Sequence, residues 1–280
     1  MNKPEYPIYV ISKGRADCCL SSIALQRDNV PHKVVVEPQE LDEYKKYMPD
    51  ADYLVTPFSN LGQRSIPVRN FIWEHSLSLS HTRHWCVDDN IRKWRYFNGH
   101  ERIEINALTA FEIVEEFTNR FANVAISGPA YTFFALPKQN MPPFRKNCHV
   151  YSCMLIRNNL PFRWRGPWNE DVDLNLQSLA IKQCTLQLNA ITCDKQATMT
   201  MKGGNSTEYQ NLDSRAFGSR TLQQRWPGIV ELTNKYGRPH FHVKDNWQTF
   251  RDIPLIKNTK HTPKRFNLKL TTNNTQGSNG

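Results

Sequence analysis

Short apolar runs alternate with longer amphipathic segments over roughly the first 160 residues of this 280-residue chain. The apolar runs are rich in β-branched residues, which is typical of buried strands. Strands are expected at residues 7–12, 32–37, 52–58, 84–89, 123–128 and 149–158. The amphipathic segments predict helices over residues 17–28, 40–48, 67–79 and 107–122. This alternation indicates an α/β fold with a mainly parallel central sheet, in which ligands bind at the carboxyl ends of the strands.

The second half of the chain is less regular. A helix is expected over residues 169–184, a strand over 185–192, a short helix over 219–226 and a strand over 229–235, with a glycine-containing loop at 199–205. Because no internal repeat and no linker interrupts the pattern, residues 1–257 are expected to form one domain. Residues 258–280 are basic and then polar, so they cannot bury a core and are expected to form a disordered tail.

The chain carries a formal net charge of +10. Residues 257–280 contain five lysines and arginines and no acid, so half of the excess positive charge is concentrated there. A basic surface favours polyanions such as nucleic acid or phosphorylated ligands. Solubility alone is the alternative explanation of the charge.

The cysteines and the apolar runs bear on the compartment. Seven cysteines occur, which is an odd number, and no two of them form a CxxC pair. This usage favours a reducing compartment. The N-terminus lacks the apolar region of a signal peptide, and no apolar run approaches the roughly 20 residues that span a membrane. We therefore expect a cytoplasmic protein without a membrane segment.

Two adjacent carboxylates, Asp88 and Asp89, end the strand that is expected at residues 84–89. This position puts them at the ligand-binding edge of the sheet. Mg²⁺ and Mn²⁺ prefer oxygen ligands and accept substrate phosphates as further ligands. The pair therefore suits a metal ion that is held against a diphosphate. Since Asp and Asn are also common in turns that end strands, a structural role is the alternative.

Three acids, Glu170, Asp171 and Asp173, begin the helix that is expected over residues 169–184. Acids in the first turn of a helix commonly cap its amide groups and complement its dipole, which is the structural alternative. The functional interpretation is a general base that takes the proton of an acceptor hydroxyl. Neighbouring carboxylates and burial are expected to raise the pKa of such a base.

Cationic and small residues occur in loops that the expected fold brings to the same edge of the sheet. Arginine supplies forked donors, and glycine lets the backbone approach a phosphate closely. The candidate donor-binding residues, besides Asp88, are Lys13, Arg15, Arg64, Arg69, Asn70, Lys202 and Gly203. The chain contains neither a Walker-type phosphate loop nor a GxGxxG sequence, so nucleoside triphosphate hydrolysis and dinucleotide binding lack support.

Arginines and aromatic residues are interleaved just before the three acids. Such side chains can stack on a base and pair with phosphate. The candidate acceptor-binding residues are Arg163, Trp164, Arg165 and Trp168. A buried aromatic cluster explains the same residues equally well. The position beside the acids favours a pocket for a base that has been flipped out of duplex DNA.

Two histidines, His240 and His242, lie in a segment whose alternation points both to one side. Next to a metal site that distant acids build, one of them becomes a candidate further ligand. The alternative is a pair of surface histidines.

The order of these motifs resembles the TET/JBP-associated glycosyltransferases, which tailed phages largely encode. The similar segments are PIYVISKGRAD, VVVEPQE, PFSNLGQRSIPVRNFIWEH, HWCVDDNIR, YSCMLIRNNLPFRWRG, NEDVDLNLQ and MTMKGGN. The match runs in order over roughly residues 6–243. The resemblance implies a GT-A-like, Rossmann-type single domain. It also implies a nucleotide-sugar donor, here a UDP-sugar, and transfer of a hexose or pentose to 5-hydroxymethylcytosine in DNA.

The resemblance implies donor and metal roles for particular residues. Asp88 and Asp89 correspond to the DxD-type site that binds Mn²⁺ or Mg²⁺ together with the donor. His242 corresponds to a late metal ligand, although the spacing leaves His240 open. Arg69 and Asn70 match the segment that closes over the donor in similar transferases.

The resemblance also implies a catalytic base, Asp171 of the Glu170–Asp171 pair, with Asp173 as the substitute. In the implied reaction the hydroxymethyl oxygen of the base attacks the anomeric carbon of the sugar, and Asp171 accepts its proton. The metal stabilises the charge that develops on the leaving diphosphate, and the cationic loop residues help to neutralise its phosphates. This route would invert the anomeric centre.

Two other functions would use the same residues. A metal-dependent nuclease or nucleotidyltransferase would employ the same acids, but a nuclease fragments DNA where a transferase adds mass to it. A non-catalytic DNA-binding protein would bind DNA through the positive charge and through the aromatic and arginine residues of 162–168. Its DNA binding would be salt-sensitive and unaffected by metal or nucleotide sugar. That function leaves the strand-end acids unexplained.

Overall fold

The computed structural model of the protein describes residues 3–137, 140–166, 168–196, 201, 203, 212–235 and 238–263. Within this part of the chain, ten strands form one large sheet. They are β1 (Ile8–Ile11), β2 (Lys33–Val36), β3 (Asp52–Val55), β4 (Arg83–Asp88), β5 (Ile91–Phe97), β6 (Arg102–Ile105), β7 (Val124–Tyr131), β8 (Phe144–Lys146), β9 (Cys153–Arg157) and β10 (Cys184–Lys195). Their order is β3-β2-β1-β4-β9-β7-β10-β5-β6, and β8 pairs with β10.

The first four strands form a parallel sheet, as the sequence predicts. β1 pairs in parallel with both β2 and β4, and β2 pairs in parallel with β3. β9 then runs antiparallel between β4 and β7, and β10 is parallel to β7. The predicted α/β fold is therefore confirmed. The carboxyl ends of β1, β2 and β4 meet at one edge of the sheet, because parallel strands point the same way.

A hairpin of β5 and β6 extends the far side of the sheet, and the sequence prediction did not include it. The two strands pair antiparallel, and β5 also pairs antiparallel with β10. Only residues 98–101 connect them, which is the short connection that antiparallel neighbours allow.

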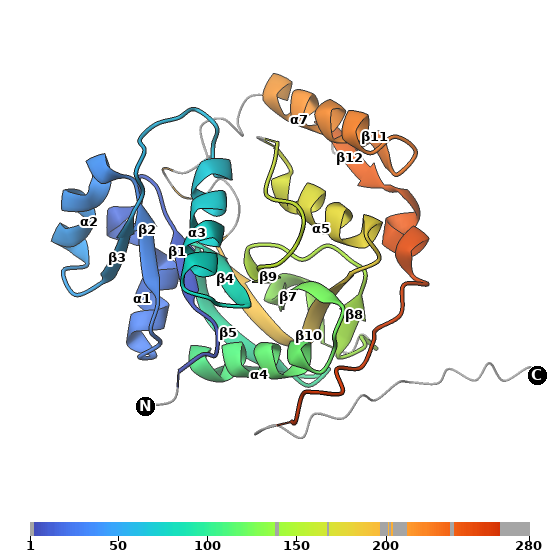
Figure 1. Cartoon of the computed structure of the whole chain (residues 1–280), viewed down its shortest axis with the longest axis horizontal. Coiled ribbons are helices and arrows are strands. Elements are labelled where there is room, and N and C mark those ends of the chain that lie inside the picture. The colour runs from blue at the N-terminus through green and yellow to red at the C-terminus, as the bar shows by residue number, and fades with distance from the viewer. Residues whose placement is uncertain are drawn as a thin grey trace, which may run out of the picture.

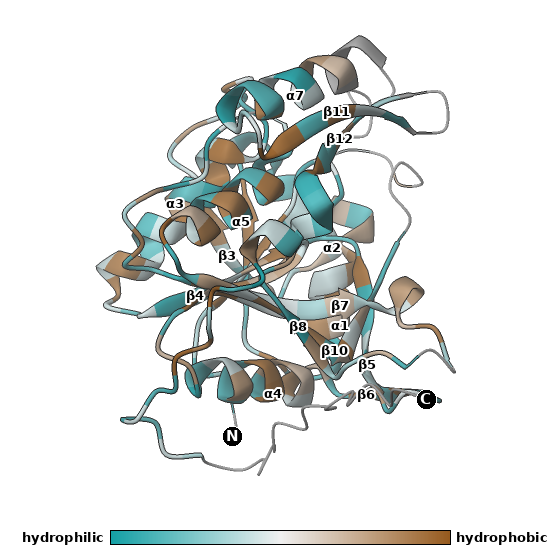
Figure 2. Cartoon of the chain, turned by 90° about the vertical axis from the view of Figure 1, so that its right-hand side faces the viewer, coloured by the Kyte–Doolittle hydropathy of each residue, from teal (hydrophilic) through white to brown (hydrophobic). Residues whose placement is uncertain are grey.

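Helices cover both faces of the sheet (Figure 1). The α-helices next to it are α1 (Leu20–Arg27), α2 (Leu41–Tyr47), α3 (Ile66–Ser78), α4 (Ala107–Asn119) and α5 (Glu170–Ala180), and 3-10 helices span Ala16–Cys18, Pro38–Glu40, Thr132–Phe134 and Lys244–Phe250. Helices α1, α2 and α4 pack into one hydrophobic cluster, whereas α3 packs into another, and α5 contributes Leu179 to the first and Leu174 to the second. Figure 2 shows α4 on one side of the strands and α3 with α5 on the other.

Successive residues of each central strand contribute to opposite clusters. In β1, Ile8 and Val10 belong to the cluster of α1 and α4, whereas Tyr9 belongs to that of α3. In β2, Val34 and Val35 divide in the same way. A strand that is buried on both faces has a nearly continuous apolar sequence. This is why the sequence predicts these strands well.

A small C-terminal unit lies over the outer side of α5 (orange in Figure 1). It consists of α7 (Leu212–Arg225) and the antiparallel hairpin of β11 (Val230–Lys235) and β12 (Arg238–Val243). The apolar residues that join it to α5 are Val172, Leu176, Leu222, Val230 and Val243. Because α5 is packed between this unit and the sheet, the position of its first turn is fixed.

The chain then returns along α4 (red in Figure 1). Asn123 Nδ2 donates to the Pro254 carbonyl at 2.8 Å, and His261 Nε2 lies 3.1 Å from the Glu116 carboxylate. Contacts with the domain thus continue to His261. The predicted boundary after residue 257 stays a prediction, because most of the expected tail lies outside the described residues. None of the described helices has the length and apolar character that crossing a membrane requires.

Candidate active site

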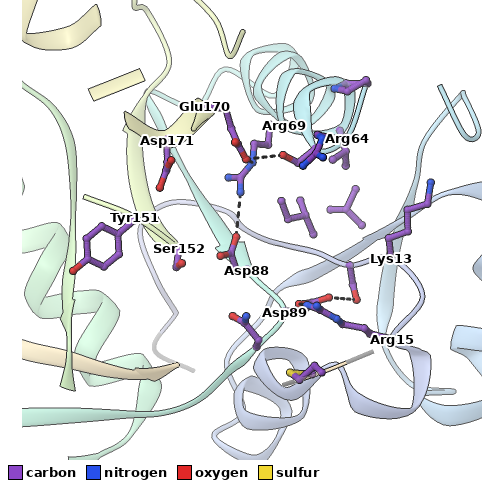
Figure 3. Close-up of a pocket in the computed structure, with 18 of the residues that line it drawn as sticks. Lys13, Arg15, Arg64, Arg69, Asp88, Asp89, Tyr151, Ser152, Glu170 and Asp171 are labelled. Atoms are coloured by element: carbon purple, nitrogen blue, oxygen red, sulfur yellow. Dashed lines mark hydrogen bonds and ion pairs between the residues drawn. The ribbon is translucent and has the colours of Figure 1, made fainter. Parts of the chain in front are cut away.

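A cavity of about 680 Å³ lies where the carboxyl ends of β1, β2 and β4 meet the first turn of α5 (Figure 3). Residues from both acid motifs, from the cationic loops and from the segments around β7 and β9 line it. The polar and aromatic side chains among them include Lys13, Arg15, Arg64, Arg69, Asp88, Asp89, Tyr131, Phe134, His149, Tyr151, Glu170, Asp171 and Lys195. The two acid motifs, which are far apart in the sequence, therefore share one cavity.

Arg69 of α3 joins the two acid motifs. Its Nη2 lies 3.1 Å from Asp88 Oδ1 at the end of β4, and its Nε lies 3.7 Å from Glu170 Oε1 at the start of α5. The guanidinium also lies 4.5 Å from the centre of the Trp164 ring. Burial alone would lower the pKa of Arg69, but the surrounding Cys86, Asp88 and Glu170 outweigh it and raise the pKa. The arginine is thus a permanently charged link.

Asp89 is buried, and each of its two carboxylate oxygens has a partner. Ser12 Oγ donates to its Oδ2 at 2.7 Å, and Arg15 Nη1 pairs with its Oδ1. Burial raises its pKa, although the charge of Arg15 and the hydrogen bonds oppose this effect. Both carboxylate oxygens are therefore occupied in holding the loop after β1. A metal ion at Asp89 would compete with the charge of Arg15 and with the hydrogen bond from Ser12.

Asp88 differs from its neighbour, because its side chain is 23% exposed to the cavity. Its Oδ1 accepts from Arg69, whereas its Oδ2 is 3.7 Å from the amine of Lys195. The Oδ2 oxygen, whose cationic neighbour is 3.7 Å away, could serve as a ligand of a divalent metal ion that also binds substrate phosphates. Of the two strand-end acids, Asp88 is the one whose surroundings fit a metal ligand.

Glu170 and Asp171 begin α5 and both line the cavity. Asn169, which precedes them, has a left-handed backbone conformation with φ of 53°. Ser65 Oγ donates to Glu170 Oε1 at 2.8 Å. Burial raises the pKa of Glu170, and the charge of Arg69 partly offsets this rise. Glu170 therefore mainly holds the side chains of Arg69 and Ser65 in place.

Asp171 forms a pair with His149. The distance from His149 Nε2 to Asp171 Oδ2 is 3.0 Å, and the Val172 amide donates to Oδ1 at 2.9 Å. Burial alone would raise the pKa of Asp171, but the histidine and the amide outweigh it and lower the pKa to about 2. The sequence analysis expected a raised pKa, which is wrong because it did not include His149. Asp171 is ionised at neutral pH, and its side chain remains 31% exposed.

Asp173 does not reach the cavity lining. Its side chain is completely buried and accepts from Arg165 Nε at 2.8 Å, from Gln177 Nε2 at 2.9 Å and from Trp226 Nε1 at 2.7 Å. Two residues correspond to about 200° around a helix, so Asp173 points away from Asp171 and toward α7. The structure therefore gives Asp173 a structural role and removes it as the substitute base.

The cationic loops meet at the end of the cavity that is opposite Asp171. Lys13 Nζ lies 2.7 Å from Glu37 and 2.8 Å from the Asn60 side chain. Arg15 Nη2 donates to the carbonyl of Gly203 at 3.2 Å. A side chain at position 203 would place its Cβ 2.3 Å from the Gly14 carbonyl oxygen, so only glycine fits this crossing. Lys202, another predicted donor residue, lies outside the described residues.

Arg64 and Asn70 are both predicted to bind the donor, but the structure places only Arg64 at the cavity. Arg64 lines the cavity, and its guanidinium stacks 3.0 Å from the centre of the Trp168 ring. Asn70 is not part of the lining. Its side chain instead exchanges two hydrogen bonds of 3.0 Å with the backbone of Trp164. It fixes the segment before α5 and does not face the donor.

In the predicted acceptor segment the two tryptophans are buried, whereas the two arginines are partly exposed and paired with acids, so the aromatic rings are not available as a surface for a base. Trp164 and Trp168 are 2% and 7% exposed. Arg163 pairs with Glu74 at 2.7 Å, and Arg165 pairs with Asp173. None of these four predicted residues lines the cavity. The alternative of a buried aromatic cluster describes Trp164 and Trp168 correctly, whereas Arg163 and Arg165 lie at its partly exposed margin.

His242 is on β12, away from the acids. The alternation does place His240 and His242 on the same side, but Phe241 and Val243 face the core, so His242 is exposed. Neither histidine lines the cavity. Among the described residues, no three His, Cys, Asp or Glu side chains are grouped closely enough to hold a metal ion. His242 is thus a surface residue in this structure.

Sequence reasoning missed several residues that line the cavity. His149, Tyr151 and Ser152 lie in a segment that the sequence predicts as a strand, but β9 begins only at residue 153. Lys195 ends β10 three residues beyond the predicted end of that strand. In the sequence, His149 could have been noticed as a histidine inside an apolar run. Lys195 could have been noticed as a cation at the end of a strand.

Comparisons with known proteins gave one family model that matches the chain. The model of a protein family described as TET-associated glycosyltransferase matches residues 6–204. No curated protein matches the chain. Glucosyl-3-phosphoglycerate synthase from Mycobacterium tuberculosis, solved with Mg²⁺ and UDP, is similar at 11% identity and a TM-score of 0.44, over 85% of this chain and 87% of that one. A candidate nucleotide-diphospho-sugar transferase from Desulfovibrio desulfuricans is similar at 10% identity and a TM-score of 0.34, over 66% and 78%.

Replacing Arg69 with Ala is expected to destabilise the fold by about 3 kcal/mol or more, because it leaves Asp88 and Glu170 without their shared buried cation. The free energy of unfolding in urea measures this loss. Arg251→Ala is the control, since Arg251 pairs with Asp252 at an exposed position and its removal should cost less than about 0.5 kcal/mol. Equal stability of the two variants would contradict the role assigned to Arg69.

Proposed function

Because the chain belongs to the TET-associated glycosyltransferase family, we propose that it transfers a sugar from a nucleotide-sugar donor to the hydroxymethyl group of 5-hydroxymethylcytosine in DNA. The family supports the sugar transfer, and the chain is accordingly a glycosyltransferase. The DNA acceptor is supported by the association of this family with TET enzymes and by the net charge of +10. We further propose that a phage encodes this enzyme and that it acts in the cytoplasm of the host cell.

One observation carries the proposal, namely that cations and an ionised carboxylate occupy opposite ends of the same cavity. Arg15 and Lys195 lie next to the acids at the end of β4, and Lys13 lines the cavity beside Glu37, which follows β2. Asp171, held by His149, lies at the start of α5. A donor whose diphosphate binds at the cationic end would direct its sugar toward the carboxylate. This is the arrangement that displacement at the anomeric carbon requires, with the base on the side of the acceptor.

The diphosphate is proposed to bind through the cations and through a divalent metal ion at Asp88. The exposed oxygen of Asp88 fits this role better than Asp89, whose oxygens already bind Ser12 and Arg15. Mg²⁺ or Mn²⁺, when bound, would stabilise the charge of the leaving diphosphate. Lys13 and Lys195 would pair with the phosphate oxygens. The donor is proposed to be a UDP-sugar that carries a hexose or a pentose.

Asp171 is the proposed general base. Its low pKa keeps it ionised, and His149 fixes the orientation of the carboxylate. It would accept the proton of the hydroxymethyl oxygen as that oxygen bonds to the anomeric carbon, while the bond from the sugar to the diphosphate breaks. Attack from the side opposite the diphosphate inverts the anomeric centre. Glu170 is proposed to hold Arg69 in place beside this base.

The direct test incubates the protein with 5-hydroxymethylcytosine DNA, Mg²⁺ or Mn²⁺ and a panel of nucleotide sugars, followed by mass spectrometry of the nucleosides. We expect 5-hydroxymethyl-2′-deoxycytidine to gain the mass of one sugar residue and unmodified 2′-deoxycytidine to gain none. Asp171→Asn should lower kcat by about 100-fold or more, since general base catalysis contributes that much. A chelator should abolish transfer.

Two outcomes of this assay would contradict the proposal. Fragmented DNA without added mass would favour the metal-dependent nuclease. DNA that binds but gains no mass with any donor would favour a non-catalytic DNA-binding protein, whose binding should depend steeply on salt. Full activity of Asp171→Asn would remove only the assignment of the base.

Replacing His149 with Phe tests the proposed base through its pH dependence. The ring that stacks against Trp247 is kept, but the donor to Asp171 is lost. The pKa of Asp171 should then rise from about 2 toward or above its ordinary value of about 3.9, because burial is no longer offset. A base works only when it is ionised, so the ratio of variant to wild-type kcat should be constant above about pH 6 and fall as the pH decreases from about 5 to about 3.

The matched control is Trp247→Phe, which keeps the hydrogen bond between His149 and Asp171 and should give a ratio that does not depend on pH. If His149→Phe lost the same fraction of kcat at every pH, the low pKa of Asp171 would not matter for the rate. His149 itself would then be the better candidate for the proton transfer.

A further inference from the structure

Two phenylalanines are held in solvent beside the cavity. They belong to the 3-10 helix Thr132–Phe134, which directly follows β7. Phe133 is 78% exposed, the largest value among the exposed large hydrophobic residues of the described chain, and Phe134 is 49% exposed. Exposing such apolar area is unfavourable in water. Exposed apolar side chains that lie next to one another commonly mark a surface that binds a partner.

The backbone that carries these rings is firmly attached to the sheet. Thr132 is buried, and its hydroxyl donates to the Thr192 hydroxyl of β10 at 2.9 Å. Ala135 is completely buried, and Arg102 Nε donates to its carbonyl at 2.8 Å. The turn is thus fixed on both sides of the phenylalanines. The rings are exposed because the fold presents them, and they are not part of a loosely held loop.

The rings continue an aromatic wall of the cavity. Phe134 lines the cavity and stacks on Tyr131 with ring centres 6.1 Å apart and planes 18° from parallel. Tyr131 lies 4.2 Å from the ring of Tyr151, which is close to Asp171 in the same cavity (Figure 3). Phe133 contacts Phe134 edge-on at 5.4 Å. A planar group that slid along this wall would pass from Phe133 toward the proposed base.

Positive charge lies on the same side of the molecule. Arg145 of β8 is exposed, and its charge acts on Tyr151 of the cavity wall. Arg102 binds the turn itself. An apolar platform flanked by arginines suits a nucleobase and its phosphates better than it suits an uncharged apolar partner.

We propose that Phe133 and Phe134 are the DNA-binding platform of this enzyme, with Phe134 and Tyr131 guiding the extruded base into the cavity and Phe133 filling the gap that the base leaves in the duplex. This inference rests on the proposed function, because it takes DNA as the acceptor. It also supplies the aromatic contact that the buried residues Trp164 and Trp168 do not provide. Apolar side chains that enter between base steps act in this way in other DNA-binding proteins.

The test compares Phe133→Ala with the wild type on two acceptors of the same sequence, a duplex and a single strand, each with one 5-hydroxymethylcytosine. Loss of one stacked ring should lower kcat/KM on the duplex by about 10-fold or more. Transfer to the single strand should change by less than about threefold, because no gap in a helix has to be filled. Phe133→Tyr should keep most of the duplex activity.

Phe217→Ala is the matched control. Phe217 of α7 is 56% exposed and does not line the cavity, so its removal should change neither activity. Equal losses of Phe133→Ala on duplex and single strand, or no loss on either, would overturn the platform. A wild-type dimer in sedimentation that Phe133→Ala dissociates would assign the rings to a second copy of the chain and would also overturn it. Absence of wild-type transfer to both acceptors would instead reject the proposed function.

Discussion

The buried guanidinium of Arg69 connects the two halves of the site. It contacts Asp88 at the end of β4 and Glu170 at the start of α5, while Trp164 covers its face. A buried cation is costly unless carboxylates compensate it, and buried carboxylates have the same requirement. The three charges therefore hold each other in place. This mutual dependence sets the distance between the proposed donor end and the proposed base, and it makes helix α3 a structural part of the site.

Residues of one chemical type acquire different roles in this site through burial and partners. Asp88 and Asp89 are adjacent in sequence, yet Asp89 is buried against Ser12 and Arg15 while the side chain of Asp88 is more exposed to the cavity. Asp171 and Asp173 divide similarly, because the helix turns one toward His149 and the other toward α7. The low pKa of Asp171 and the burial of Asp173 follow from these neighbours. Side-chain chemistry alone would have treated all four as equivalent.

The fold was largely predictable from sequence, whereas the site was predictable only in part. Strands such as β1 and β2 are buried on both faces, so their continuous apolar runs identify them. The strand β5 and its neighbour β6, at the edge of the sheet, have mixed polarity and were not identified. Asp88, Arg69 and Asp171 were found because strand ends and helix starts can be located in a sequence. His149 and Lys195 were missed because their approach depends on tertiary contacts between distant segments.

The misassigned residues share a physical cause. Trp164 and Trp168 belong to an alternating aromatic and cationic segment, and such a segment can form either a DNA surface or a buried cluster. Only the exposure of the aromatic rings separates the two, and that exposure depends on what packs over the segment. The exposed rings of Phe133 and Phe134 gave no pattern in the sequence, since two phenylalanines after an apolar strand resemble core residues. Their position became informative only when the turn was seen to hold them in solvent.

The central claim is that the cationic end of the cavity binds the diphosphate of a nucleotide sugar. Calorimetric titration of UDP into the protein, with and without Mg²⁺, tests it most directly. We predict that UDP binds, that Mg²⁺ tightens binding, and that Lys195→Met weakens it by about 10-fold. Lys33→Met, which removes a cation paired with Asp52 outside the cavity, should leave binding unchanged. No binding of UDP or of any other nucleoside diphosphate, or equal binding by both variants, would contradict the claim.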